Sequence, residues 1–373
     1  MSECGVKEFK LRELLKIYNG TKYDHLNKGD IPLYGSGGLM SHVNEALYSG
    51  EAILLPRKGT LSNIMYVNES FWTVDTMYYA VVNDKLADAF YLYSYLSQLD
   101  LSNLDSGSTL PSMTKSAYES IVVKLPDLKI QKAVATILFN IRKKLETNNK
   151  INQELEAMAK TLYDYWFVQF DFPDQNGKPY KSSGGKMVYH PELKREIPEG
   201  WGVESVGNLL DKVTKAEKIE NNSIEFIGEI PVIDQSQKYI AGFTNNENAI
   251  LQPQDGHVIF GDHTRVVKYI NFDYARGADG TQVLISNNEN ISNVLLYHMI
   301  EDFDLSNYGY ARHFKFLKEK TVIVPDKEVS SKFETQANVI YEKIKNNIFE
   351  NQELTQLRDW LLPMLMNGQV KVE

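Results

Sequence analysis

The sequence has little of what marks a secreted or membrane-spanning protein. It contains a single cysteine, Cys4, so no disulfide bond can form within the chain. No apolar run approaches the roughly 20 residues that a membrane-spanning helix needs. The first residues, from Met1 to Glu8, are polar and acidic, unlike a secretory signal. We therefore expect a globular protein that works in the reducing cytoplasm.

The sequence also lacks the motifs of several catalytic sites. It has no Pro-Pro dipeptide, which the active site of methyltransferases that modify exocyclic base nitrogens requires, and no Gly-x-Gly-x-x-Gly loop. The phosphate-binding pattern Gly-x4-Gly-Lys-Ser/Thr of motor proteins is missing as well. The seven histidines are scattered, and His257 and His263 have no carboxylate pattern beside them, so we expect no metal site.

Positive charge is in deficit, because 49 acidic residues face 40 basic ones and the net charge is -9. Neutralisation of phosphates supplies most of the non-specific affinity of proteins for nucleic acid. The charge therefore leaves two interpretations open. Either the protein binds no nucleic acid, or it reads bases locally while a partner supplies most of the positive surface.

What the sequence does contain is an internal repeat. Three short motifs recur in the same order, each 199 residues after its first copy, while the segments between them differ in length. The alternative is convergence on a common strand–proline–helix pattern. The motifs are Ile31-Pro32 with Ile230-Pro231, Val123 to Asp127 with Val322 to Asp326, and Asn152 to Leu155 with Asn351 to Leu354.

Each copy of the repeat begins with short β-type runs and ends with a long helical pattern. Gly, Asn and Asp turns separate the runs, which predicts strand-rich α/β domains over residues 1–127 and 201–326. Apolar residues spaced by three and four predict long helices within 128–170 and 327–373, the latter ending at Pro363 before a tail. The turn-rich residues 171–200 form a linker that leads into the second domain.

The apolar residues of both helices form a narrow stripe of the heptad kind, here called the seam. Asn148 and Asn351 fall near the seam, where a polar residue costs stability but fixes register. The simplest packing is an antiparallel coiled coil of the two helices, and the alternative is that each helix packs on its own domain. The predicted fold class is α+β, with two strand-rich domains in tandem, each followed by a long helix.

The repeat, the helices and the missing catalytic motifs together resemble the specificity subunit of type I restriction-modification enzymes. Leu125-Pro126 followed by Ile130-Gln131 is similar to the start of a conserved helix of that family, and Ala159 to Phe167 to its end. The other similar segments are Ile31 to Gly38, Arg57 to Thr60, Ser106 to Ser108 and Phe260 to Arg265 in the target-recognition domains, Ile197 to Trp201 at the start of the second domain, and Leu357 to Gly368 at the C-terminal end.

The resemblance implies a non-catalytic subunit in which each domain reads one half of a bipartite, asymmetric DNA site. The helix pair would set the spacer and dock two modification subunits, which methylate adenine with S-adenosylmethionine. Restriction subunits that translocate DNA with ATP would complete the complex, so this chain would itself bind no cofactor, and ATP and Mg²⁺ would belong to partner subunits. Phosphate contacts by the modification subunits would then explain the acidic charge.

Base reading needs hydrogen-bonding side chains on loops, and docking needs apolar side chains near the helix ends. For DNA we select Arg57, Lys58, Ser108, Thr109 and Lys115 in the first domain, and His263, Arg265, Arg276, Tyr310, Arg312, His313 and Lys315 in the second. For partner subunits we select Tyr163, Trp166, Phe167, Phe170, Trp360, Leu361 and Met364. The alternative roles are solvated surface charges and apolar caps of the helix core.

Two other functions stay open at this point. Asp174, Glu192 and Lys194 match the loose Pro-Asp…Glu-x-Lys pattern of metal-dependent nucleases, so the chain could be a stand-alone DNA-cleaving restriction protein. The pattern lies in the turn-rich linker, and Pro-Asp also occurs at residues 126–127 and 325–326, which weakens this interpretation. The other possibility is a duplicated DNA-binding scaffold or regulator.

Overall fold

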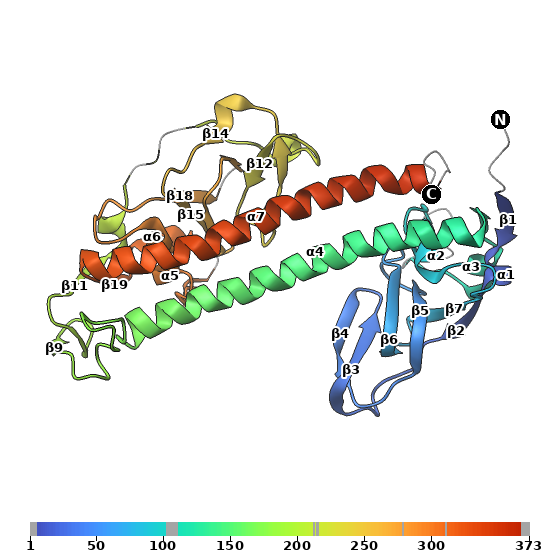
Figure 1. Ribbon diagram of the computed structural model, residues 1–373, viewed down its shortest axis with the longest axis horizontal. Helices are drawn as coiled ribbons and strands as arrows, with labels where there is room; N and C mark the ends of the chain where they lie inside the picture. The colour runs from blue at the N-terminus through green and yellow to red at the C-terminus, as the bar shows by residue number, and fades with distance from the viewer. Residues whose placement is uncertain are drawn as a thin grey trace. The chain divides into compact units, whose positions relative to one another are not determined.

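The computed structural model describes residues 6–101, 111–211, 213, 216–277, 280–309 and 312–366. The chain divides into two compact units, namely unit 1 with Met1–Glu146 and Asn351–Glu373, and unit 2 with Thr147–Glu350. Both divisions fall inside long helices, α4 (Leu128–Tyr163) and α7 (Lys327–Met366), which Figure 1 shows in green and red. Each unit therefore contains one strand-rich domain and a part of both helices. Within the described residues, no helix has the length and apolar character needed to cross a membrane.

Unit 1 is built on a six-stranded sheet with the strand order β2-β7-β5-β6-β3-β4. All neighbours are antiparallel except β3 and β6, which run parallel. The central strand β5 is buried on both faces, since Ile53 and Leu54 point into different cores, which explains its unbroken apolar run. The strands are β2 (Leu15–Asn19), β3 (Lys28–Gly35), β4 (Gly38–Val43), β5 (Tyr48–Pro56), β6 (Met65–Thr73) and β7 (Met77–Val82).

Short helices and a second, two-stranded sheet complete unit 1. The Asp88 carboxylate accepts the Tyr91 N–H at 2.9 Å and caps α2 (Ala89–Leu96). Thr114 caps α3 (Lys115–Ser120) in the same way. The remaining elements are α1 (Leu11–Leu14) and the antiparallel strands β1 (Lys7–Lys10) and β8 (Val122–Leu125).

Unit 2 repeats this plan with shorter strands. Its strands form a sheet of order β13-β12-β17-β14, another of order β16-β15-β18, and the pairs β11-β19 and β9-β10. The strands are β9 (Met187–His190), β10 (Arg195–Pro198), β11 (Gly202–Ser205), β12 (Ile230–Ile233), β13 (Gly242–Thr244), β14 (Ile250–Leu251), β15 (His257–Gly261), β16 (Val267–Ile270), β17 (Tyr274–Arg276), β18 (Thr281–Leu284) and β19 (Thr321–Val324). The helices are α5 (Asn293–Ile300), α6 (His313–Lys318) and short 3₁₀ turns.

The strand pairings confirm the internal repeat. The parallel pair β3–β6 joins Leu33 to Trp72, and the parallel pair β12–β17 joins Val232, which lies 199 positions after Leu33, to Ala275. In unit 1 the strand β5 pairs antiparallel with β6 and β7, and in unit 2 the strand β15 pairs antiparallel with β16 and β18. The pattern of backbone hydrogen bonds is thus shared, although the connecting loops differ in length.

Within each unit the two long helices run side by side in opposite directions. In unit 2, Asn152 of α4 accepts a hydrogen bond from Asn347 of α7 at 2.8 Å, while Asn148 donates to Glu350 at 2.7 Å. As the position rises along α4, the partner's position falls along α7, which confirms the predicted antiparallel pairing. The second buried asparagine of the seam is Asn347, 3% exposed, and not the Asn351 that the sequence suggested. Asn347 is the true repeat equivalent of Asn148, 199 positions on.

The prediction that Pro363 ends the second helix is wrong, because α7 continues to Met366. A proline inside a helix removes one backbone hydrogen bond. Packing offsets that loss here, since Leu365 is 2% exposed in the core of unit 1, and Leu361 and Leu362 pack against the same core. The last turn is therefore fixed by tertiary contact and not by its own propensity.

The predicted linker belongs to the core of unit 2. After α4 the chain passes through a π-helical turn, Asp164–Val168, and the positive φ of 67° at Phe170 redirects it. Phe172 then stacks between Tyr180 and Trp201, with ring centroids 4.6 and 5.0 Å away. Strands β9 and β10 form a hairpin in the same segment. Aromatic packing thus fastens residues 171–200 to the second domain.

Candidate nucleic-acid interface

Three chain segments meet at the same place in both units, at the end of the central strand. In unit 1 the Arg57 carbonyl, just after β5, accepts the Met113 N–H at 2.9 Å, and the Arg57 N–H donates to the Thr76 carbonyl at 2.8 Å. In unit 2 the residue just after β15 is Asp262, whose carbonyl accepts the His313 N–H at 2.9 Å. The Asp262 N–H donates to the Gly280 carbonyl at 2.7 Å. We call these two places the reading loops of unit 1 and unit 2.

The reading loops of unit 1 carry exposed basic side chains. Arg57 and Lys58 are exposed, and the Arg57 guanidinium lies 6.0 Å from the centre of the Tyr78 ring. Lys58 forms a β-bridge with Ser112, which fixes its backbone. Lys115 is the first residue of α3, also exposed, and its 3.8 Å ion pair with Glu119 is screened by water. Ser108 and Thr109, which the sequence also selected, lie outside the described residues.

The reading loops of unit 2 enclose a small cavity of about 190 Å³. The structure brings His263, Arg276 and Arg312 to it, all three selected from the sequence. Sequence reasoning missed its other lining residues, which are Lys218, Asp262, Gly280, Thr281 and Gln282. Only Asp262 stood in a motif that the sequence singled out, namely Phe260 to Arg265. Lys218 approaches from a distant loop, where Ile219 pairs with Gly277, so nothing in its local sequence placed it there.

The other selected residues of unit 2 lie around this cavity in different environments. Arg265 is exposed in a tight turn with a φ of 64°, and Lys315 is exposed on α6. His313 is only 4% exposed, and its Nδ1 lies 2.9 Å from the Asp262 carbonyl oxygen. His313 is thus a positioning residue in this structure, which corrects the expectation that its ring faces DNA. Tyr310 lies outside the described residues.

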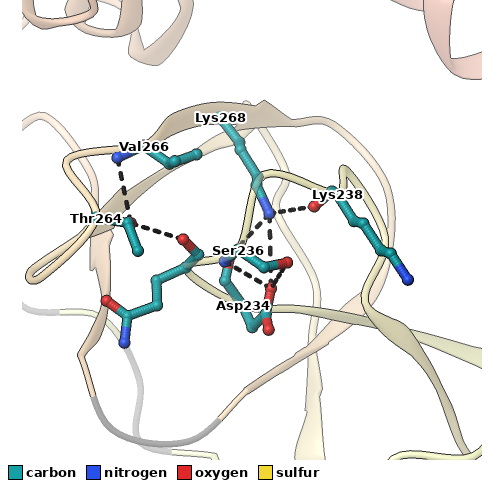
Figure 2. A network of polar contacts seen from close by, with 7 residues as sticks. Asp234, Ser236, Lys238, Thr264, Val266 and Lys268 are labelled. Atoms are coloured by element: carbon teal, nitrogen blue, oxygen red, sulfur yellow. Dashed lines mark hydrogen bonds and ion pairs between the residues drawn. The ribbon is translucent and has the colours of Figure 1, made fainter. Parts of the chain in front are cut away.

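A buried lysine fixes the loops behind the cavity (Figure 2). The Lys268 ammonium, 4% exposed, donates to the carbonyls of Asp234 at 2.8 Å and Lys238 at 2.5 Å. Burial lowers the pKa of Lys268 to about 8, against the opposing attraction of the Asp234 carboxylate 3.8 Å away. The Thr264 hydroxyl donates to the Gln235 carbonyl at 2.6 Å. The loop that carries His263 is therefore tied to the 234–238 loop by charged and neutral hydrogen bonds.

The residues selected for partner binding divide into two groups. Trp166, Phe167 and Phe170 are at most 5% exposed and lie in the core of unit 2, so they are not the exposed apolar patch that the sequence suggested. Tyr163 is half-buried and stacks on His298, with ring centroids 5.5 Å apart. At the other end, Trp360 is 60% exposed, whereas Leu361 and Met364 are half-buried.

The residues of the nuclease pattern have separate structural roles. The Asp174 carboxylate accepts the N–H groups of Asn176 and Lys178, which closes a turn and lowers the pKa of this carboxyl. Glu192 lies 3.4 Å from the Thr321 hydroxyl, in the hairpin region. Across the parts of the chain that the structure describes, no cluster of three or more His, Cys, Asp or Glu side chains could hold a metal ion.

Comparison with known proteins agrees with this architecture. Residues 3–157 match the family model of the type I restriction modification DNA specificity domain. The chain is 25% identical over 302 residues to the type I restriction enzyme MjaIX specificity subunit of Methanocaldococcus jannaschii, which covers 73% of this chain and 66% of that protein. It is 23% identical over 338 residues to the HindI specificity subunit of Haemophilus influenzae, covering 70% of this chain and 72% of that protein.

The fold is also that of a solved structure. The S subunit of a type I restriction-modification system from M. genitalium superposes with a TM-score of 0.66 over 98% of this chain and 97% of that chain, at 14% identity. The fold that the two proteins share consists of two strand-rich domains in tandem and a pair of long helices. The first domain thus matches the family model of the DNA specificity domain, and the chain is similar to specificity subunits of type I restriction-modification enzymes. These similarities favour that function over a stand-alone nuclease or a scaffold.

Proposed function

We propose that each unit of this specificity subunit reads one half of a bipartite, asymmetric DNA site through its reading loops. The observation that carries the proposal is that the same backbone frame presents different side chains in the two units. Arg57 and Lys58 follow β5 in unit 1, whereas Asp262 and His263 follow β15 in unit 2. Since base edges are distinguished by their donors and acceptors, unlike side chains at equivalent places would select unlike bases.

We further propose that the chain itself is non-catalytic and works within a larger complex. The chemistry would lie in two modification subunits with S-adenosylmethionine and in restriction subunits with ATP and Mg²⁺. Exposed Trp360 at the end of α7 offers one docking contact for a modification subunit, because a large exposed aromatic side chain gains free energy when a partner covers it. The net charge of -9 supports a division of labour in which partners supply many phosphate contacts.

Paired single substitutions test the assignment of one half-site to each unit. In the assembled methyltransferase complex, Lys58→Ala should relax base preference in one half-site only, and His263→Ala in the other only. Each lost side-chain contact should reduce discrimination at its position by about 1 to 3 kcal/mol. The measurement is sequencing of methylated sites in host DNA, where each variant serves as the other's control. Relaxation of both half-sites by either variant would contradict the proposal.

A further inference from the structure

The cavity in the reading loops of unit 2 concentrates positive charge in an acidic protein. Arg276, Arg312 and Lys218 line it together with His263, and among the lining residues that the structure describes the one carboxylate is that of Asp262. One oxygen of that carboxylate is already engaged, since it accepts the Phe314 N–H at 2.8 Å. Arg276 and Arg312 alone outnumber this carboxylate, and their positive charges repel each other in a small space. A negatively charged ligand would relieve this repulsion, whereas a neutral ligand would not.

Two residues that line the cavity each have a buried polar group without a hydrogen-bond partner among the described residues. Thr281 is 4% exposed, and its hydroxyl has no hydrogen-bond partner among the residues that the structure describes. The buried Nε of Arg276 likewise finds no acceptor within the described parts of the chain. A buried polar group without a partner costs roughly 1 to 3 kcal/mol. Thr281 and Arg276 both line the cavity, and their hydroxyl and guanidinium N–H, which find no acceptor among the described residues, are donors that an anion's oxygen atoms would satisfy.

The walls of the cavity suit an anion better than a base. None of the eight described lining residues has a hydrophobic or aromatic side chain other than the His263 imidazole. Pockets that receive an extruded base stack it between aromatic or apolar side chains. Phosphates, in contrast, are held by arginine, lysine, hydroxyl and N–H donors.

The donors are held in place before any ligand arrives. The Asp262 carbonyl accepts the His313 N–H, and the Asp262 carboxylate accepts the Phe314 N–H, so the first turn of α6 is fastened to the end of β15. Arg312 directly precedes that turn and is therefore presented to the cavity from a fixed backbone. Arg276 lies on β17, which pairs with β12 and β14, and Thr281 lies on β18, which pairs with β15. A rigid cluster of donors loses little conformational entropy when it binds an anion.

We propose that this cavity binds one backbone phosphate of the DNA, with Arg276, Arg312 and Thr281 as its donors. The proposal rests on the proposed DNA-reading function of unit 2. Arg312 and Arg276 would contact the DNA backbone and so position unit 2 on the duplex. Base reading would be left to the exposed residues around the cavity, such as His263 and Arg265. One phosphate contact would thus fix the position of unit 2 along the duplex.

Inorganic phosphate is the first probe, added to the full chain in place of chloride at constant ionic strength. Calorimetric titration should show saturable binding to the natural chain and to the control Lys343→Ala, which removes an exposed charge of unit 2 outside the cavity. Thr281→Val, which keeps the side-chain shape, should weaken binding about tenfold. Arg276→Ala should abolish saturation. Equal binding by all four proteins, or no saturable binding to the natural chain, would overturn the site.

The second probe is duplex DNA, which separates a backbone phosphate from a free phosphate and from a base. For a random-sequence duplex, Arg276→Ala should lower affinity and reduce the slope of log K against log salt by about 0.9, the value of one neutralised phosphate. Methylated-site sequencing of the same variant should return unchanged bases in both half-sites. Altered bases with an unchanged salt slope would show a base contact and refute the proposal.

The two probes also separate this proposal from the proposed function. If the natural chain bound phosphate but the complex methylated no bipartite site, DNA reading by the two units would be refuted, and the DNA phosphate with it. Suppose instead that Thr281→Val and Arg276→Ala methylated a bipartite site normally and that their DNA affinity depended on salt as in the natural chain. Only the phosphate site would then be refuted.

Discussion

The reading loops of units 1 and 2 share a backbone frame but differ in the buried side chains beside it, which are apolar in unit 1 and polar in unit 2. Met77 of β7 pairs with the last residue of β5, and Thr281 of β18 pairs with the last residue of β15. Met77 and Met113 are fully buried in unit 1, where unit 2 has Thr281 and His313. The frame is held by backbone hydrogen bonds, which do not depend on the side chains. The comparison shows how one scaffold can carry two unlike reading surfaces, as an asymmetric DNA site requires.

A second difference lies where each long helix leaves its domain. In unit 1 the Gln131 side chain, 1% exposed, donates to the Pro126 carbonyl at 2.9 Å and accepts the Asp88 N–H at 3.0 Å. At the equivalent position of unit 2 stands Ser330, which is buried but much smaller. Unit 2 instead packs Phe333 against the rings of Trp166 and Phe167. The helix is thus fastened by a polar contact in one unit and by aromatic packing in the other.

The largest expected effect concerns the helices that both units share. A heptad inserted into α4 after Glu146 and another into α7 after Glu350 should leave both sets of recognised bases unchanged and lengthen the spacer between them. Seven residues add about 10.5 Å of helix, which corresponds to roughly three base pairs at 3.4 Å each. Sequencing of methylated sites measures the spacer directly.

Insertion into α4 alone is the control for this experiment. It shifts the apolar stripe of α4 out of register with that of α7 and should therefore abolish methylation. An unchanged spacer with both heptads present would refute the idea that the helix pair sets the distance between the two half-sites.

The next effect separates the two ways of fastening the helix. Gln131→Leu leaves the Asp88 N–H and the Pro126 carbonyl without their partner, which should lower the free energy of unfolding of unit 1 by about 2 to 3 kcal/mol. Ser330→Ala in unit 2 should cost about 1 kcal/mol or less. Hydrogen exchange of α2 and α5, followed by mass spectrometry, reports the stability of each unit separately. Similar losses of stability in the two units would show that the hydrogen bonds of Gln131 stabilise unit 1 no more than the contacts of Ser330 stabilise unit 2.

The smallest effect is a pH dependence that belongs to unit 2. The pKa of Lys268 is lowered from 10.5 to about 8 by burial, so between these values the unfolded chain binds more protons at this site than the folded chain. Stability from this group therefore rises with pH across that window, by about 1 to 2 kcal/mol between pH 8 and pH 10. Burial raises the pKa of Tyr269 and Tyr274, which lowers stability above about pH 10 and limits the window.

Chemical denaturation of the natural chain and of Lys268→Met at pH 8 and pH 10 isolates this contribution. The difference in the free energy of unfolding between the two proteins should shift in favour of the natural chain at the higher pH. A difference that is the same at both pH values would mean that Lys268 does not titrate in this window.

Several features could be predicted because they depend on local pattern. The 199-residue repeat predicted matching domains, which the pairings β3–β6 and β12–β17 confirm. The three- and four-residue spacing predicted two long helices, and their simplest packing, antiparallel, is confirmed by the pairing of Asn152 with Asn347. The repeat offset applied to Asn148 would also have given Asn347. Polar residues beside Gly-containing turns pointed to Arg57, Lys58 and His263, which the structure places in the reading loops.

Other features depended on contacts between distant residues. The composition of Trp166, Phe167 and Phe170 suits a docking surface as well as a core, and only the packing against Phe333 and Trp201 decides between them. His313 has the residue type of a base reader, but its burial beneath Asp262 gives it a positioning role.

The sequence by itself determined the duplicated plan and the positions of the two long helices, because periodic apolar spacing and repeated motifs are properties of the chain. Only the tertiary structure decided which charges meet. Lys218, Arg276 and Arg312 come from three separate segments, which strand pairing and the hydrogen bonds of α6 to Asp262 bring to one cavity. A backbone frame common to both units then leaves the side chains of the reading loops free to differ, because the bonds that hold the frame are made by main-chain atoms.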